Sequence, residues 1–323
     1  MKAIRIHQTG GPEVLSLDDI DLPSPGPDQV RVRHTAIGVN FLDTYHRSGL
    51  YKLQLPSGIG SEAAGIVEGV GDNVRHVKIG DRVAYVGVIG SYAEAANVPS
   101  FKVVKLPAAI SDEIAAAALL KGLTAQYLLK RLYQVKPGQT ILAHAAAGGV
   151  GLILCQWAKH LGATVIGTVG SKDKAALARA HGCDHVLNSR TDDIAKEVRA
   201  LTGGAGVPVV YDSIGKDTFE ASLNSLEMRG LMVSYGNASG SPPPVDLHHD
   251  LTYKGSLFIT RPTLVHYTRT AEEIQSAADD LFSVIEGGVV KVEIRQRFRL
   301  DQARAAHEAL HSRATTGATV LLP

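Results

Sequence analysis

Cysteine is scarce in this sequence, which has two cysteines, Cys155 and Cys183, among 323 residues. One stands in an expected helix and the other before an expected strand, which excludes a disulfide framework and favours two buried thiols. Dense runs of lysine or arginine are also missing, and the formal net charge is +1. The charge pattern therefore gives no indication of a nucleic-acid or anionic-membrane partner.

A signal-peptide pattern is absent as well. Residues 1–7 read directly as a strand and lack the apolar core of a signal peptide, which predicts a cytoplasmic protein. Hydrophobic residues make up 45% of the chain, as in an ordinary globular protein, and the length leaves room for about two domains. These features favour a soluble enzyme.

A glycine-rich turn follows the apolar run that begins at Ile141 and leads into a helical pattern. Ala145, Gly148 and Gly151 have the spacing of a dinucleotide-binding turn, where small residues let the backbone approach a pyrophosphate at the positive end of the next helix. The spacing alone fits a turn that serves only packing equally well as one that binds a dinucleotide. A membrane span is disfavoured by the glycines and by the alternating elements that follow.

Short β-rich runs and helical stretches alternate after this turn, as a doubly wound parallel sheet requires. With the strand before the turn, the expected strands number six, which is the content of a full Rossmann fold, so a chance turn becomes the minority explanation. The further expected strands are 164–169, 185–188, 207–212, 231–235 and 256–260, and the expected helices between them are 172–181, 192–201 and 217–226.

The end of the second expected strand bears on which nicotinamide cofactor would fit. An acidic residue there would accept hydrogen bonds from the ribose 2′-hydroxyl of NAD, but Gly170 and Ser171 occupy the position, with Lys172 and Lys174 just beyond. A 2′-phosphate suits hydroxyl and ammonium donors, so the sequence favours NADPH. Asp173 counts against this interpretation because it could compete for a lysine, and a solvated first helical turn is the alternative.

The regions on either side of this series have a different pattern. Short alternating strands broken by proline and glycine, at 29–36, 63–70 and 81–85, indicate an all-β unit before it. After it, the sequence predicts a helix at 271–285, a strand at 290–298, a helix at 300–312 and an apolar strand at 319–322 that returns to the first domain. We expect the chain to cross between the domains near Gly122 and Arg261.

Several blocks along nearly the whole chain resemble the zinc-free, ζ-crystallin-like quinone oxidoreductases of the medium-chain dehydrogenase/reductase superfamily. The blocks that carry the resemblance are 10–15, 38–45, 47–51, 60–67, 121–124, 144–151 and 211–215. The resemblance implies an α/β protein with a GroES-like, β-rich catalytic domain at 1–123 and 262–323 and a Rossmann domain at 124–261. It also implies an NADPH cofactor, a quinone or other conjugated acceptor, and a homodimer joined through the Rossmann domains.

Candidate site residues follow from the strand ends and from the resemblance. We expect Asn40, Tyr45 and Tyr51 to line the acceptor site, with Asp43 as an alternative that orients Tyr45 or its neighbours. The candidates for the cofactor are Phe41, Tyr45, Lys121, Thr124, Tyr127, Gly148, Gly149, Val150, Gly170, Ser171, Lys174, Ser189, Arg190, Ser213, Gly236 and Asn237, with Arg261 and Arg313 reaching it from the closing segments; Arg261 is also a candidate for the chemistry.

Zinc ligands of the metal-dependent relatives are replaced in this chain. Those relatives carry histidine where Ser61 stands and cysteine near Asn40, so the resemblance implies a reductase without a metal. The stretch from His307 to His311 has the H-E-x-x-H spacing of zinc proteases, but nothing downstream completes such a site, and we interpret both histidines as ordinary surface or interface residues. Two other functions stay open: reduction of enones or alkenals with NADPH, and an NADPH-binding sensor or RNA-binding protein with little turnover.

Overall fold

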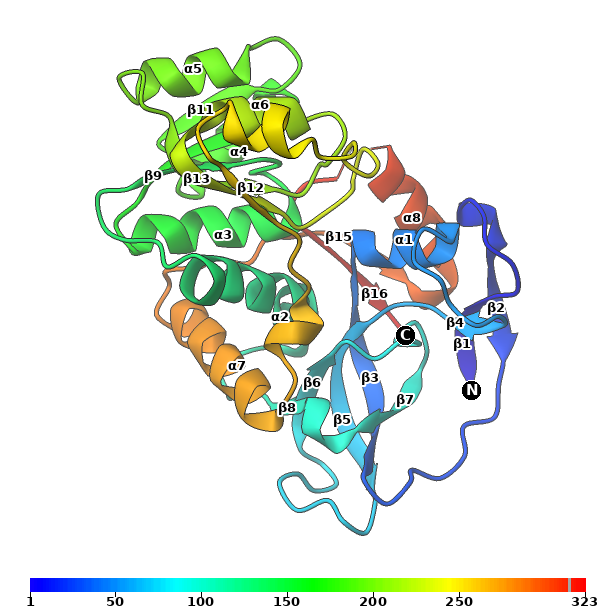
Figure 1. Cartoon of the computed structure of the whole chain (residues 1–323). Coiled ribbons are helices and arrows are strands. Elements are labelled where there is room, and N and C mark those ends of the chain that lie inside the picture. Colours follow the sequence, from blue (N-terminus) through cyan, green and yellow to red (C-terminus); the bar gives the residue numbers. More distant parts are fainter. Residues whose placement is uncertain (313–314) are drawn as a thin grey trace. The chain divides into compact units, whose positions relative to one another are not determined.

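The structure is a computed structural model that describes residues 1–312 and 315–323 (Figure 1). The chain divides into two compact units. The first unit comprises Met1–Leu123, Thr268–Glu286 and Val292–Pro323, and the second comprises Thr124–Tyr267 and Gly287–Lys291. The domain boundaries drawn from the sequence stay a prediction. The chain passes from one compact unit to the other after Leu123, Tyr267, Glu286 and Lys291.

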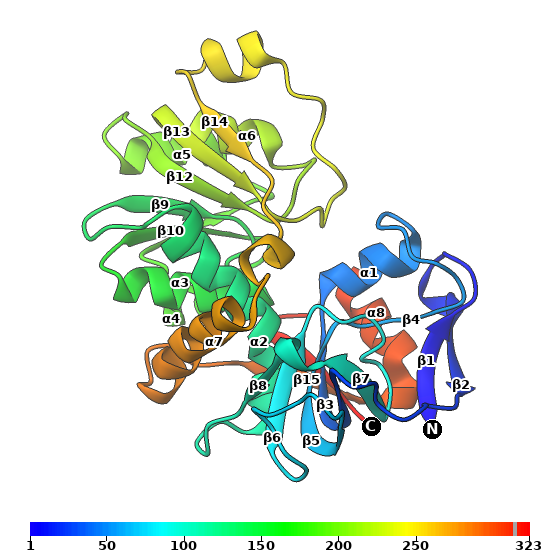
Figure 2. The ribbon, with the colours of Figure 1, turned by 60° about the horizontal axis from the view of Figure 1, so that its bottom comes forward.

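The second unit is built on a six-stranded parallel sheet with the order β11-β10-β9-β12-β13-β14, which Figure 2 shows from β10 to β14. This is the strand order of a doubly wound dinucleotide-binding sheet, and it confirms the expected fold class. The strands are β9 Thr140–Ala143, β10 Thr164–Val169, β11 His185–Asn188, β12 Val207–Asp212, β13 Leu226–Ser234 and β14 Phe258–Thr260, and the helices between them are α3 Gly149–His160, α4 Lys172–Ala180, α5 Ile194–Leu201 and α6 Phe219–Ser225.

Burial explains why these segments form a sheet covered by helices. The central strands are apolar along their length because both faces are covered, as Val209 and Val210 of β12 show with no exposed surface. The helix α5 is apolar on one side alone, where Ile194 and Val198 reach the core cluster beneath it. The periodicity of the sequence thus predicts this unit well.

The first unit contains a larger, mostly antiparallel sheet of the order β15-β16-β3-β5-β6-β8, with β7 also paired to β3, and a small sheet of the order β2-β1-β4. Its strands are β1 Lys2–Ile6, β2 Leu15–Asp19, β3 Gln29–Val39, β4 Ser57–Gly58, β5 Glu62–Val70, β6 Arg82–Val86, β7 Ala95–Pro99, β8 Val103–Lys105, β15 Ile294–Arg299 and β16 Ala318–Leu322, and its helices are α1 Phe41–Ser48, α7 Ala271–Glu286 and α8 Ala303–His311. The pairing of β16 with β3 brings the end of the chain into the sheet of its first strands.

A helix that the sequence analysis does not predict, α2 at Asp112–Gln126, continues into a π-helix at Tyr127–Leu132. Residues 115–119 are all fully buried, so the helix has no polar face to reveal its period. At Gly122 a Cβ atom would lie 2.3 Å from the Leu281 side chain of α7, so this glycine lets the two helices pack closely without moving Leu281. No helix in the described residues is both long and apolar enough to cross a membrane.

Candidate functional site

The turn between β9 and α3 is shaped for close approach by a ligand. Ala145 adopts a left-handed φ of 54°, and a Cβ atom at Gly151 would lie 2.3 Å from the Ala145 carbonyl oxygen. Gly148 precedes the helix, and Gly149 and Val150 form its first turn, all half-buried. The first N–H groups of a helix have no partner within it and carry its positive end, so this turn can hold a phosphate.

A buried polar network supports the same turn from below. The His144 ring, directly after β9, lies 3.0 Å from the Thr168 hydroxyl through Nδ1 and 3.0 Å from the Ser222 hydroxyl through Nε2. Ser222 in turn donates to the Asp212 carboxylate at 2.7 Å. Burial lowers the pKa of His144, which keeps the ring neutral. The network ties together the carboxyl ends of β9, β10 and β12, where ligands of such sheets bind.

Asp212 also shapes the segment that follows β12. Its carboxylate accepts hydrogen bonds from the N–H groups of Ile214 and Gly215, at 2.8 and 3.0 Å, and from the Thr218 hydroxyl. Ser213, a predicted cofactor residue, is therefore held at the strand end, half-exposed. A Cβ atom at Gly236 would lie 2.4 Å from the Ser213 carbonyl oxygen, so the ends of β12 and β13 approach closely.

Two further predicted residues lie at the same edge of the sheet. Asn237 follows Gly236 and is almost fully buried. Arg261 comes directly after β14, and its Nη1 atom donates to the carbonyl oxygens of Ser234 and Gly236 at 2.9 and 3.0 Å. The described contacts of Arg261 thus stabilise the end of β13; its part in chemistry stays a prediction.

Basic and hydroxyl side chains gather at the ends of β10 and β11. The Ser171 hydroxyl caps α4 by accepting a hydrogen bond from the Lys174 N–H. The guanidinium of Arg190 lies over Gly170: a Cβ atom placed on this glycine would be 3.4 Å from the Arg190 Nε atom. Ser189 is anchored to the Val169 carbonyl oxygen through both its N–H and its hydroxyl. The tertiary structure thus brings the segment with Ser189 and Arg190 beside the end of β10, where Gly170, Ser171 and Lys174 follow in the chain.

Aromatic residues stand where the second unit begins and ends. Tyr127, at the start of the π-helix, stacks on Tyr267 with ring centroids 4.3 Å apart and an interplanar angle of 10°. Burial raises the pKa of Tyr127, so its hydroxyl stays protonated. Thr124 is almost fully buried nearby in the sequence. The stack joins two segments that are 140 positions apart along the chain.

In the first unit the predicted acceptor residues lie along α1 and just after it. Asn40 caps this helix and is buried, whereas Phe41 beside it is exposed. Tyr45 and Tyr51 meet edge to face with ring centroids 5.4 Å apart, and the Tyr51 N–H donates to the Tyr45 carbonyl oxygen. Both rings are half-buried. This gives one polar and three aromatic side chains on a short segment.

Two buried carboxylates hold the beginning of α1. Asp43 accepts hydrogen bonds from the Asn40 N–H at 2.8 Å and from the Tyr92 hydroxyl at 3.0 Å. Glu62 accepts from the Asn40 side-chain amide at 2.8 Å and pairs with the Lys121 ammonium at 3.3 Å. Glu62 is a site residue that the sequence does not predict; the one sign of it is a carboxylate at the head of the apolar strand β5. Asp43 orients the Asn40 backbone in this structure, and its role in orienting Tyr45 stays a prediction.

The interpretation of both histidines in the H-E-x-x-H stretch as surface or interface residues is wrong for His307. His307 is not a surface residue: it has no exposed surface and lies on the inner side of α8, whereas His311 is exposed. The helical period explains the difference, since α8 buries Ala303, Ala306 and His307 on one face. Across the described part of the chain, no three metal-binding side chains are grouped to hold an ion. Arg313, another cofactor candidate, lies outside the described residues.

The sheet order, the phosphate-holding turn and the basic strand ends define the second unit as a dinucleotide-binding domain of an oxidoreductase. Comparison with known families agrees. Residues 26–108 match the alcohol dehydrogenase GroES-like domain, and residues 149–282 match the family model named zinc-binding dehydrogenase.

Comparison with individual proteins shows to which family within this superfamily the chain belongs. The quinone oxidoreductase of Pseudomonas aeruginosa is 54% identical over 100% of this chain and 99% of its own. A 2-haloacrylate reductase from Burkholderia sp. is 48% identical over 98% of each chain. The crystal structure of Escherichia coli quinone oxidoreductase complexed with NADPH superposes with a TM-score of 0.98, at 50% identity and full coverage of both chains. The chain belongs to the quinone oxidoreductase family of the medium-chain dehydrogenase/reductase superfamily.

The buried carboxyl of Asp43 gives a testable pH dependence. Burial raises its pKa from 3.8 to about 7, against the opposing effects of the Asn40 and Tyr92 hydrogen bonds. Between these two values the folded state holds a proton that the unfolded state releases, so stability falls as the pH rises through this window. The expected slope is up to about 1.4 kcal/mol per pH unit.

Denaturant unfolding of the wild type and of Asp43→Asn, measured from pH 4 to pH 8, checks this. We expect the asparagine variant to lose this part of the slope, since its side chain does not titrate. Identical slopes in the two proteins would show that Asp43 is ionised throughout.

Proposed function

We propose that this chain is an NADPH-dependent quinone oxidoreductase that works without a metal ion. The observation that carries the proposal is the group Gly170, Ser171, Lys174 and Arg190 at the ends of β10 and β11, where two cationic side chains and one hydroxyl replace the carboxylate expected for NAD. A 2′-phosphate carries about two negative charges and forms strong hydrogen bonds to such donors. The relatives named quinone oxidoreductases, one of them crystallised with NADPH, support this assignment.

The remaining parts of the cofactor fit the other strand ends. The pyrophosphate would be held by the first N–H groups of α3 at Gly149 and Val150, where the small residues of the turn leave room. Ser213, Gly236 and Asn237 would contact the cofactor from the ends of β12 and β13. Phe41, Thr124, Tyr127 and Lys121 would lie at its nicotinamide end, and Ser189, Arg261 and Arg313 would add contacts from their segments.

Reduction of a quinone places modest demands on the protein. When bound, NADPH supplies a hydride, and the electron-poor ring of the acceptor takes up both electrons. The residues of the chain have to orient the acceptor and stabilise the oxygen that becomes anionic. Asn40, Tyr45 and Tyr51 line the acceptor site in this proposal, and water completes the protonation because a hydroquinone anion is stabilised by its own ring.

A second function is favoured by one comparison. The relative named 2-haloacrylate reductase indicates that this scaffold also serves the reduction of activated alkenes. The chemistry is the same in outline, because an enone or acrylate is also an electron-poor conjugated acceptor. Reduction of enones or alkenals with NADPH is therefore the alternative proposal.

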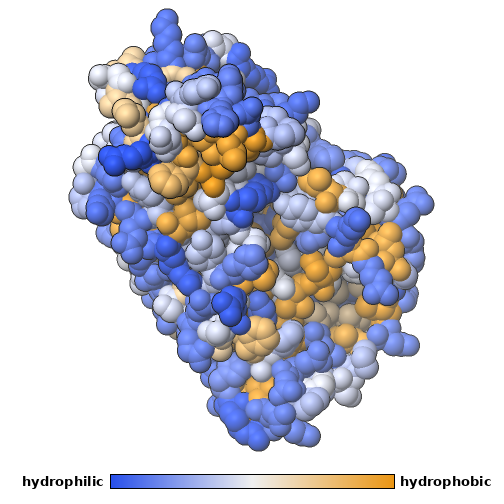
Figure 3. Space-filling model, viewed as in Figure 1, coloured by the Kyte–Doolittle hydropathy of each residue, from blue (hydrophilic) through white to orange (hydrophobic). Residues whose placement is uncertain are grey.

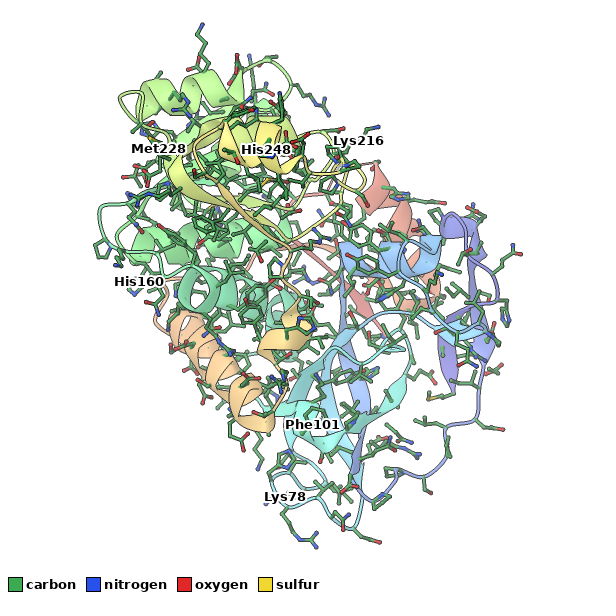
Figure 4. The ribbon with its side chains drawn as sticks, in the orientation of Figure 1. Lys78, Phe101, His160, Lys216, Met228 and His248 are labelled. Carbon is green, nitrogen blue, oxygen red and sulfur yellow. The ribbon has the colours of Figure 1, made fainter. Side chains whose placement is uncertain are left out.

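We also place the protein in the cytoplasm as a homodimer joined through its second unit. The edge strand β14 supports the dimer because it pairs with β13 on one side and ends the sheet on the other. Large apolar side chains are exposed around it: Phe258 60%, Met228 77%, Leu247 69% and Tyr253 79%. Figure 3 shows apolar side chains on one face of this unit. His248, which is labelled in Figure 4 in the same orientation, lies on that face. Such a patch is typical of a protein interface.

The reaction itself is tested with one panel of substrates. We expect the purified protein to oxidise NADPH rapidly with benzoquinones and naphthoquinones, slowly with enones and haloacrylates, and equally well after treatment with a metal chelator. Absorbance of NADPH measures the rates. Preference for enones or haloacrylates would favour the alternative function, tight NADPH binding without turnover would favour a sensor, and loss of activity on chelation would refute the metal-free reaction.

The cofactor assignment is tested at Lys174. Lys174→Ala should weaken NADPH binding by about tenfold or more and leave NADH binding nearly unchanged, because the lost ammonium contacts the 2′-phosphate alone. The matched control is Lys172→Ala, an exposed lysine in the same helical turn. Dissociation constants from cofactor fluorescence check this. Equal losses for NADPH and NADH would contradict the assignment.

The dimer is tested on β14. Phe258→Glu places a charge on the proposed interface and should convert a dimer into monomers, as measured by light scattering at several protein concentrations. Ile79→Glu, at another exposed apolar residue but in the first unit, is the control and should leave the mass unchanged. A wild-type mass of one chain would refute the dimer.

A further inference from the structure

His307 belongs to a line of buried polar side chains in the first unit. Its Nδ1 atom lies 2.9 Å from Nη1 of Arg47, and its Nε2 atom lies 3.1 Å from the Tyr92 hydroxyl oxygen. The Tyr92 hydroxyl then donates to Asp43 at 3.0 Å. None of these four side chains is exposed. Buried polar side chains are costly without partners, so their geometry is strongly constrained. Each of these four has at least one partner, and Nη2 of Arg47 is left without one.

The direction of every hydrogen bond in this line follows from one residue. A guanidinium can donate and cannot accept, so Arg47 donates to Nδ1 of His307. The ring proton of a neutral His307 then lies on Nε2 and is donated to the Tyr92 oxygen. The Tyr92 hydroxyl therefore donates its proton in a hydrogen bond to Asp43. Burial, with the nearby charge of Arg47, lowers the pKa of His307 to about 3, which agrees with a neutral ring.

The line ends at the residue that begins α1. The Asp43 oxygen that accepts from Tyr92 also accepts from the Asn40 N–H at 2.8 Å. The Asn40 side chain is fixed independently by Glu62. The backbone position of Asn40, from which its side chain extends, therefore depends on Asp43. Asp43 in turn is held by Tyr92, which is bonded to His307, and by the Ser61 hydroxyl, which donates to the other carboxyl oxygen at 3.4 Å.

The same line joins two helices that are distant in sequence. Figures 1 and 2 both show α8, which carries His307, beside α1, which carries Asp43 and Arg47. The Tyr92 and His307 rings pack edge to face at 5.7 Å between centroids. Arg47 also donates from Nε to the Gly10 carbonyl oxygen, which anchors the end of the line to the loop before β2.

We propose that His307 and Tyr92 are positioning residues of the acceptor site, which hold Asn40 in place through Asp43. The inference rests on the proposed function, because that function assigns Asn40 to the acceptor. It gives a role to the histidine whose spacing resembles a zinc motif: the ring is a fixed hydrogen-bond relay from α8 to α1. Only one of the two histidines of that motif takes part.

Substitutions within the line test the proposal. Tyr92→Phe removes one oxygen and keeps the ring, and His307→Gln keeps a polar side chain. Both should lower kcat/KM for a benzoquinone by about tenfold or more, because a small displacement of Asn40 misaligns the acceptor. The dissociation constant of NADPH should not change. Their effects should not add in the double variant, since each breaks the same line.

Matched controls separate positioning from a general loss of stability. Tyr85→Phe removes another fully buried hydroxyl, bonded to His34 at 2.9 Å, that is not part of the line. His311→Gln changes the exposed histidine of the same helix. Both controls should keep the kcat/KM of the wild type, and thermal unfolding of all variants measures the loss of stability.

The activity and NADPH affinity of these variants decide whether His307 and Tyr92 position Asn40. Wild-type kcat/KM in Tyr92→Phe would overturn it, as would an equal loss in Tyr85→Phe or a loss of NADPH affinity that accounts for the whole effect. Tyr92→Phe carries the test if His307→Gln does not fold, because its packing is conserved. A wild-type protein that does not reduce quinones would refute the proposed function, a result that is distinct from a failure of the variants alone.

Discussion

A buried carboxyl group has to be stabilised by hydrogen-bond donors or by a proton, and both units meet this constraint where their proposed site residues lie. In the second unit Asp212 accepts hydrogen bonds from two backbone N–H groups and from the hydroxyls of Thr218 and Ser222. In the first unit Asp43 and Glu62 hold Asn40 from two sides. An unpaired buried charge costs on the order of several kcal/mol, which is a large part of the stability of a domain. The donors around such a carboxyl group are therefore held in position.

The two units use this constraint for different purposes. Asp212 organises strand ends, and through Ser222 and His144 it reaches the turn that is shaped for a pyrophosphate. Asp43 organises the start of one helix, which carries the polar and aromatic residues assigned to the acceptor. The proposed cofactor site and the proposed acceptor residues thus rest on separate polar networks, each inside its own unit.

Much of the second unit could be predicted from the sequence because short apolar strands alternate with helical stretches along the chain. The bounds of β10, β11 and β12 agree with the expected strands to the residue, and the strand order follows from the alternation of strands and helices. The helix α2 was missed because a helix buried on all sides has no amphipathic period. His307 was misplaced for a related reason: spacing alone does not tell which side of a short helix faces the core.

The sequence by itself determined the family, the parallel sheet and the absence of a carboxylate after the second strand, because these depend on order and spacing along the chain. Only the tertiary structure decided which distant residues meet. It placed Arg190 over Gly170, and it linked Arg47 to His307 across 260 positions. The physical reason is that a buried polar group must find its partner in space, and the partner's position in the sequence carries no sign of the pairing.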